Sequence, residues 1–193
     1  MSSVSVAWRD VRVVLLAVGL MLAVAGTAKS EATFLGLTFP DQVADADIGP
    51  TKDYEGTSPG LGYNVRYVQP GWTMDVFIYD LRRRSIPDNV ESEVVKRQLK
   101  QAQGDIIELE RRGVYAQVDL KRSYLLRDDR GRPRFQCSDF AYVHEKVGAV
   151  DSALCLTAWR GKFVKFRLTT ARHAGWDAEV KRFMDAWISI LWP

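Results

Sequence analysis

The feature that most constrains the fold is a change of hydrophobic period at Gly113. Before this glycine, apolar residues recur at spacings of four and three: Val95, Leu99, Ala102, Ile106 and Leu109. Such spacing places them on one face of an α-helix. After it, apolar residues alternate with polar ones: Val114, Ala116, Val118 and Leu120. An amphipathic helix followed directly by strands predicts that the helix packs its apolar face on a sheet.

The helix is predicted over residues 88–112. Asp88 is a suitable N-cap with Glu91 three residues later, and Gly113 is a suitable stop. A second amphipathic helix closes the chain, with its apolar residues again on one face: Trp176, Val180, Phe183, Trp187 and Leu191. Its end, Ile190 to Pro193, is apolar enough that we expect it to be docked on the domain.

The remaining segments predict strands. A hairpin is expected from 61–68 and 72–79, joined by Gln69-Pro70-Gly71, and further strands follow the first helix at 114–126, 135–145, 151–159 and 162–170. Residues 29–60 are expected to form an irregular N-terminal segment with one short strand. The predicted fold class is α+β: an antiparallel β-sheet of about six strands packed by two main helices, sandwich-like in α/β/α layers, as a single domain over 29–193.

The N-terminus predicts export. Arg9 and Arg12 precede an uncharged, mostly aliphatic run from Val13 to Ala28. This run is shorter than the ~20 residues of a membrane-spanning helix, and it has the order of regions found in a secretory signal peptide. We expect residues 1–28 to be removed after Ala28, with Ala23-Val24-Ala25 as the other plausible exit. The mature protein would then be periplasmic and would meet a membrane only through the signal segment before cleavage.

Charge and composition exclude some partners. The chain of 193 residues has a formal net charge of +3, with 27 basic and 24 acidic residues. A nucleic-acid-binding protein normally has a clear basic excess on one face, and export also argues against that partner. We expect no nucleic acid, no cofactor and no metal.

The two cysteines, Cys137 and Cys155, both lie in the exported part, where a disulfide is chemically allowed. A tight hairpin turning near Gly148 would place Cys137 opposite residue 159. The mismatch with Cys155 is then about 13 Å along the strand, too far for a bridge whose Cα atoms lie within about 7 Å. A wider loop would restore the pairing, so the sequence leaves the disulfide open.

Residues suited to catalysis are few. The chain has only two histidines, His144 and His173, and neither has the spacing of a metal-binding motif. No nucleophile motif surrounds any serine or cysteine. If the protein were an enzyme, its site would be assembled from scattered residues, and the best candidates are Asp139, His144 and His173.

Three basic clusters fall at predicted strand ends or turns: Arg82, Arg83 and Arg84; Arg130, Arg132 and Arg134; and Arg160 with Lys162. If they share one edge of the sheet, they form a basic surface patch for an envelope protein or an anionic envelope component. Acidic neighbours, among them Asp80, Asp128 and Asp129, also allow the clusters to be ordinary solvated turns.

Two segments resemble a known architecture. One runs from Gly60 through Tyr67 and Pro70-Gly71-Trp72 into a second strand, and the other runs from Ala158 to Arg167 and precedes the last helix. Their order is similar to that of Mog1/PsbP-like proteins and of exported bacterial proteins of uncharacterised function. The resemblance implies an antiparallel sheet between helices, and it assigns no site residues because that architecture serves diverse functions.

Three functional hypotheses follow. The first is an exported, soluble envelope protein that binds a ligand or another protein without catalysis. The second is a hydrolase-like enzyme with a site built from scattered residues. The third is an accessory protein tethered to the membrane by an uncleaved N-terminal helix.

Overall fold

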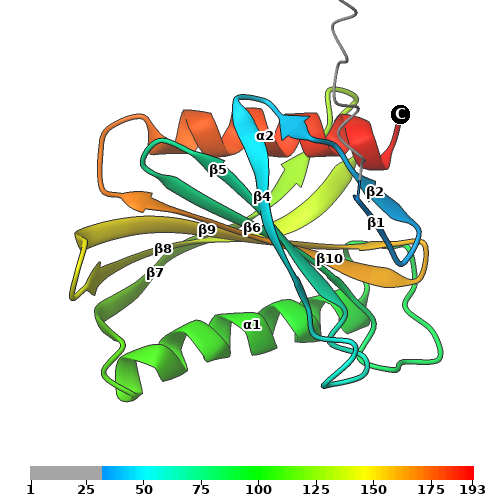
Figure 1. Cartoon of the computed structure of the whole chain (residues 1–193), viewed down its shortest axis with the longest axis horizontal. Helices are drawn as coiled ribbons and strands as arrows, with labels where there is room; N and C mark the ends of the chain where they lie inside the picture. Colours follow the sequence, from blue (N-terminus) through cyan, green and yellow to red (C-terminus); the bar gives the residue numbers. More distant parts are fainter. Residues whose placement is uncertain (1–31) are drawn as a thin grey trace, which may run out of the picture.

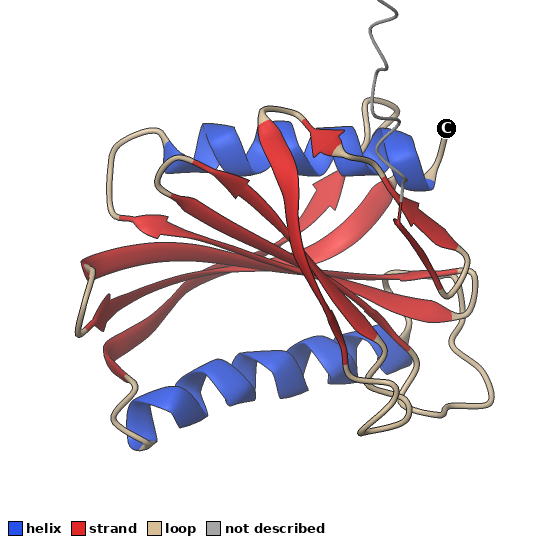
Figure 2. Cartoon of the chain, viewed as in Figure 1, coloured by secondary structure: helices blue, strands red, loops and turns tan. Residues whose placement is uncertain are grey.

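The structure, a computed structural model, describes residues 32–193, so the predicted signal peptide lies outside the described residues. Two helices pack on opposite faces of a twisted antiparallel sheet (Figures 1 and 2). The elements are β1 (Ala32–Phe34), β2 (Leu37–Phe39), β3 (Gln42–Val43), β4 (Ala46–Asp53), β5 (Tyr63–Gln69), β6 (Trp72–Tyr79), α1 (Glu93–Arg111), β7 (Tyr115–Arg127), β8 (Pro133–His144), β9 (Gly148–Trp159), β10 (Lys162–Ala171) and α2 (Trp176–Leu191). None of the helices among these residues is long and apolar enough to cross a membrane.

The main sheet has eight strands in the order β3-β4-β5-β6-β10-β9-β8-β7, and β1 and β2 form a separate hairpin. All pairings are antiparallel. The strands before α1 form one meander and the strands after it form another, and the two join where β6 pairs with β10. The α+β class and the two helices agree with the sequence prediction. The predicted number of about six strands was too low, because the main sheet has eight.

The N-terminal segment was predicted wrongly as irregular with one short strand. It contains β1 to β4, and Leu37, Phe39, Val43 and Ala46 are buried there. The strand β4 was missed because Gly49-Pro50 interrupts its alternation. Its register with β5 shifts between Ile48 and Thr51, and a bulge of this kind is where a sheet tolerates proline.

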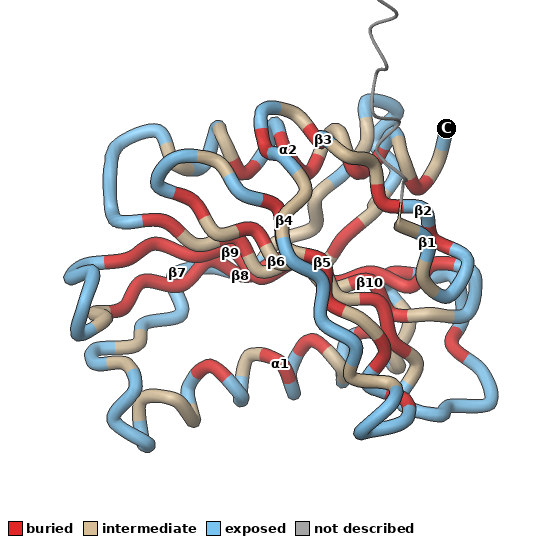
Figure 3. Tube along the Cα trace, viewed as in Figure 1, coloured by how far each residue is buried: buried red, intermediate tan, exposed pale blue. Residues whose placement is uncertain are grey.

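The sheet separates two apolar cores, visible as buried segments on the facing sides of the sheet and helices (Figure 3). The core under α2 is rich in aromatic side chains: Phe39, Tyr67, Phe166, Phe183 and Trp187. The core under α1 contains four of the five residues of the predicted helix stripe, Val95, Leu99, Ala102 and Ile106, whereas Leu109 is only half-buried. β9 is buried almost throughout because it lies between both helices.

The cysteines face each other directly. Cys137 of β8 pairs with Cys155 of β9 at a Cα–Cα distance of 4.1 Å, and the two form a disulfide. The sequence left this pairing open, and the hairpin centred on Gly148 that would have separated the cysteines does not form, because the turn lies earlier. His144 pairs with Gly148, so residues 145–147 make the turn and Gly148 already belongs to β9.

The start of α1 also differs from the prediction. Asp88 does not cap the helix, because its Oδ1 accepts the backbone N–H of Gly161 in the β9–β10 turn at 3.0 Å. The N-cap is Ser92, whose Oγ accepts the backbone N–H of Val95 at 3.3 Å. The cap therefore lies four residues later than the sequence pattern indicated.

We expect Ser92→Ala to lower the free energy of unfolding by about 1 kcal/mol, because it removes the acceptor for one unsatisfied N–H at the start of α1. Urea unfolding followed by circular dichroism measures the change. Ser92→Asp, which keeps an acceptor at the cap, is the matched control and should stay close to the wild type. Equal losses in both variants would contradict this role for Ser92.

Candidate functional site

A turn between β7 and β8 is organised by one carboxylate. Asp128 Oδ1 accepts the backbone N–H groups of Arg130 and Arg132 at 3.0 and 2.9 Å, and its Oδ2 accepts the side chains of Arg132 and Arg134 at 2.8 and 3.0 Å. Only 3% of the Asp128 side chain is exposed. Burial alone would raise the pKa of Asp128, but the hydrogen bonds from Arg132 and Arg134 outweigh it and lower the pKa to about 2. Asp128 is thus ionised at neutral pH and fixes the turn.

The C-terminal end of α2 is docked beside this turn, as expected from its apolar sequence. Trp192 lies between Arg134, whose guanidinium stacks 4.5 Å from the indole, and Phe135, whose ring centroid lies 5.6 Å away. The indole N–H of Trp159 donates to the carbonyl of Leu191 at 2.9 Å, which holds the last turn of the helix on β9. Trp192 is consequently a fixed, half-buried platform.

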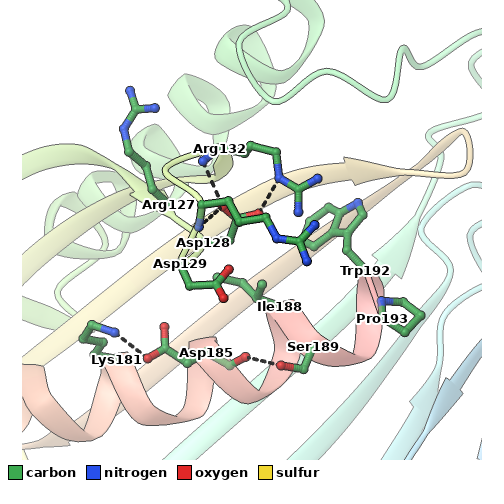
Figure 4. A pocket seen from close by; sticks show the side chains of 11 residues that line it. Arg127, Asp128, Asp129, Arg132, Lys181, Asp185, Ile188, Ser189, Trp192 and Pro193 are labelled. Atoms are coloured by element: carbon green, nitrogen blue, oxygen red, sulfur yellow. Dashed lines mark hydrogen bonds and ion pairs between the residues drawn. The ribbon is translucent and has the colours of Figure 1, made fainter.

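A groove surrounds this platform; we call it the C-terminal groove. It consists of two adjoining hollows of about 630 and 460 Å³, and both are lined by Arg130, Arg132, Trp192 and Pro193. Figure 4 shows the larger hollow, with the β7–β8 turn on one side and the exposed face of α2 on the other. The smaller hollow extends past Trp192 to Arg160 in the β9–β10 turn.

The arginines around the groove differ in their partners. Arg132 and Arg134 are held by Asp128. The guanidinium of Arg130 makes no hydrogen bond or ion pair within residues 32–193, and that of Arg160 only stacks on Trp159 at 4.6 Å. Two cations beside an apolar platform are therefore free to receive carboxylates or other anions from a partner.

Acidic groups also line the groove. Asp129 lies on the β7–β8 turn, and Asp185 lies on α2, where it pairs with Lys181. The groove therefore alternates in charge and is concave. Such a surface favours a partner of defined shape over a uniform polyanion.

Half of the predicted basic patch gathers at this groove. The structure brings Arg130, Arg132, Arg134 and Arg160 together around Trp192. Arg82, Arg83 and Arg84 lie in the connection between β6 and α1 and line neither hollow, and Lys162 pairs with Asp80 at 2.7 Å. Four of the eight residues therefore line the groove and four do not.

The candidate catalytic residues do not assemble into a reactive group. Asp139 and His173 line one open hollow of about 430 Å³, but the Asp139 carboxylate is bound by Arg122 at 2.5 Å and by the Tyr124 hydroxyl at 3.2 Å. His173 Nδ1 lies 2.9 Å from the carbonyl of Ala174. His144 is elsewhere, at the end of β8, where its Nδ1 accepts the backbone N–H of Lys146.

The surroundings of Asp139 are those of a structural ion pair. Its side chain is 3% exposed. Burial and the neighbouring Asp139 carboxylate raise the pKa of Tyr124, so the tyrosine stays protonated and donates. Within residues 32–193, no three His, Cys, Asp or Glu side chains are placed to hold a metal ion.

Comparisons with known proteins are sparse. No family model and no curated protein matches the sequence. Among solved structures, the chain is similar to cyanobacterial PsbP (CyanoP) from Synechocystis sp. PCC 6803. The TM-score is 0.45 and the identity 18%, over 79% of this chain and 83% of the other. This is a weak resemblance of architecture, of the PsbP-like kind inferred from the sequence, and it transfers no residue role.

Two residues of the groove were not singled out from the sequence. From the sequence, Asp128 is an acidic neighbour that weakens the basic cluster; in the structure it positions Arg132 and Arg134. Trp192 was expected to dock, but nothing in the sequence placed it beside Arg134. The role of Asp128 could have been predicted from the sequence Asp-Asp-Arg-Gly-Arg at 128–132. An aspartate at the first position of a turn commonly accepts the backbone N–H groups of that turn.

Proposed function

We propose that this protein is an exported, non-catalytic accessory domain that binds an acidic, partly apolar segment of an envelope protein in the C-terminal groove. The observation that supports this most is the presence of two free guanidinium groups, Arg130 and Arg160, that line the same hollow as the Trp192 platform. Arginine and tryptophan are the side chains that contribute most often to protein interfaces.

The pattern of charge favours a protein segment over a lipid surface. The groove is hollow and contains Asp129 and Asp185 between its cations. A flat anionic membrane would bring phosphates against these carboxylates as well as against the arginines. A peptide can place its carboxylates beside Arg130 and Arg160 and its apolar side chains on Trp192 and Ile188.

The binding partner can be trapped at the groove itself. A photo-crosslinking amino acid in place of Ser189, on the groove wall, should capture one envelope protein. The same amino acid in place of Lys146, in the β8–β9 turn, should not capture it. The crosslinked peptide of the partner should be rich in acidic and apolar residues. A lipid adduct, or the same capture from both positions, would contradict the proposal.

We expect Arg130→Glu combined with Arg160→Glu to weaken binding of the captured partner at least about tenfold, because each reversal places a carboxylate against the partner's own. Titration calorimetry of the purified pair measures the change. Arg83→Glu combined with Arg84→Glu is the matched control, since it changes the net charge equally outside the groove. Equal weakening by both double variants, or strong binding of wild-type protein to anionic vesicles, would overturn the groove as a protein-binding site.

A further inference from the structure

A second pocket lies on the α1 side of the sheet, across the sheet from α2; we call it the Lys165 pocket. It has a volume of about 290 Å³. The sheet contributes Phe77 and Tyr79 of β6 and Lys165 of β10. One face of α1 forms a wall with three polar residues: Gln98, Gln101 and Asp105. Ordinary ligand pockets begin at about this size, so the volume suits a small molecule.

Lys165 is a cation that makes no ion pair within residues 32–193, although the carboxylates of Asp105 and Asp75 lie near enough to oppose the lowering of its pKa by burial. Its Nζ lies 4.3 Å from the ring centroid of Phe77 and 5.6 Å from that of Tyr79. It makes no hydrogen bond, and no carboxylate of residues 32–193 lies within 4.0 Å of it. Burial lowers the pKa of Lys165, as expected for an ammonium group removed from water.

The nearest polar groups are already engaged. Asp105 accepts a hydrogen bond from Gln101 at 2.9 Å, and the Tyr79 hydroxyl accepts one from Gln98 at 3.1 Å. Burial raises the pKa of Tyr79, so it remains a neutral phenol and supplies no negative charge. The carboxylates of Asp105 and Asp75 offset only part of the cost of removing this ammonium from water, because the net effect on the pKa of Lys165 is still a lowering.

The mouth of the pocket is apolar. Tyr54, Leu61 and Leu81 line it, and Leu61 and Leu81 are 46% and 38% exposed. Exposed leucines that line the same pocket as a half-buried cation form a surface for a molecule with an apolar body.

The backbone around this mouth is held in unusual conformations. Leu81 and Arg82 both have a φ of 54°, in the left-handed region that disfavours ordinary side chains. At Gly62, a Cβ would lie 1.9 Å from the carbonyl oxygen of Ile78, so only glycine fits. The carboxylate of Glu55 accepts the backbone N–H groups of Gly60 and Gly62 at 2.9 and 3.0 Å. Strained backbone of this kind is frequent at binding sites, and here it fixes the mouth in advance of a ligand.

We propose that the Lys165 pocket binds a small organic carboxylate with a flat apolar body. The carboxylate pairs with Lys165 Nζ at the floor, and the apolar body lies against Tyr54, Leu61 and Leu81. Gln98 and Gln101 line the pocket with one amide hydrogen each engaged by Tyr79 and Asp105, which leaves the second hydrogen of each amide for the carboxylate. The pocket is independent of the C-terminal groove, because the two lie on opposite sides of the sheet.

The probe for this site is 2-naphthoate, with 2-naphthamide as its neutral counterpart of the same shape. The naturally processed protein, labelled at its leucine methyl groups, is titrated with each and followed by NMR. We expect 2-naphthoate to shift the methyl signals of Leu61 and Leu81, and we expect 2-naphthamide to bind at least about tenfold more weakly.

Variants separate the charge from the cavity. Lys165→Met keeps the length of the side chain and removes the charge, and we expect at least about a tenfold loss of 2-naphthoate affinity. Lys146→Met, an exposed lysine of the β8–β9 turn, is the matched control and should bind as the wild type does. Leu61→Asp, at a position that is 46% exposed, should weaken 2-naphthoate binding more than 2-naphthamide binding. Equal binding of both probes, unchanged affinity in Lys165→Met, or no methyl shift at millimolar 2-naphthoate would overturn the proposal.

Discussion

Replacing Cys137 and Cys155 together with alanine is expected to lower the free energy of unfolding by about 3 kcal/mol. The disulfide connects residues separated by 18 positions, and it restricts the unfolded chain by closing that loop. Both side chains are also buried in the core under α2, at 0% and 1% exposure, so the variant loses some packing as well. Urea unfolding monitored by tryptophan fluorescence measures the change as a lower midpoint.

Reduction of the wild-type protein separates the two contributions. A reductant opens the cross-link and keeps both sulfur atoms in the core, so its effect reports the cross-link alone. We expect the reduced protein to unfold at a urea concentration between those of the oxidised protein and the double variant. An identical midpoint for oxidised and reduced protein would show that the disulfide does not contribute to stability.

Trp187→Ala is expected to lower the free energy of unfolding by about 4 kcal/mol, more than the double cysteine variant does, because it leaves a cavity at the centre of the core under α2. The indole is fully buried and makes edge contacts with Phe39, Tyr67 and Phe166 at centroid distances of 5.7, 5.9 and 5.3 Å. The surrounding rings come from the sheet and the N-terminal strands. They are fixed by their own neighbours and cannot close the space.

Trp187→Phe tests which property of the indole matters. The Nε1–H of Trp187 is buried and has no hydrogen-bond partner within residues 32–193. Phenylalanine removes this unsatisfied donor and keeps most of the aromatic volume. We expect a loss below about 1.5 kcal/mol, the usual limit for a conservative core exchange. A loss equal to that of Trp187→Ala in urea unfolding would mean that the N–H is satisfied in solution.

The helices were predictable because their apolar residues repeat over many turns. The stripes from Val95 to Ile106 and from Val180 to Leu191 are buried as their spacing indicated. Helix ends and short strands were not predictable, because the preference of a local sequence can be overridden by a contact with a distant part of the chain. Asp88 is a residue type suited to an N-cap, yet its carboxylate accepts a hydrogen bond from Gly161 in the β9–β10 turn. Gly49-Pro50 interrupts the alternation of β4, so its sequence resembles that of a loop.

The sites were harder to predict than the fold. The C-terminal groove combines Arg130, Arg160 and Trp192 from three separate elements, and no local motif connects them. Lys165 alternates with the apolar residues Val164 and Phe166 along β10, which is the pattern of a lysine that faces solvent. Only the placement of α1 over that face of the sheet makes Lys165 half-buried in a pocket.

The two outer strands of the main sheet determine how this protein can meet other chains. A regular outer strand offers a row of free N–H and C=O groups on which a strand of another molecule can form hydrogen bonds. β3 is only two residues long. β7 is longer, but its register with β8 shifts at three places, and Gln117 has a φ of 55°. β3 and the shifted parts of β7 are therefore poor templates for strand addition, and the longest regular stretch of β7 is the five residues from Arg122 to Leu126.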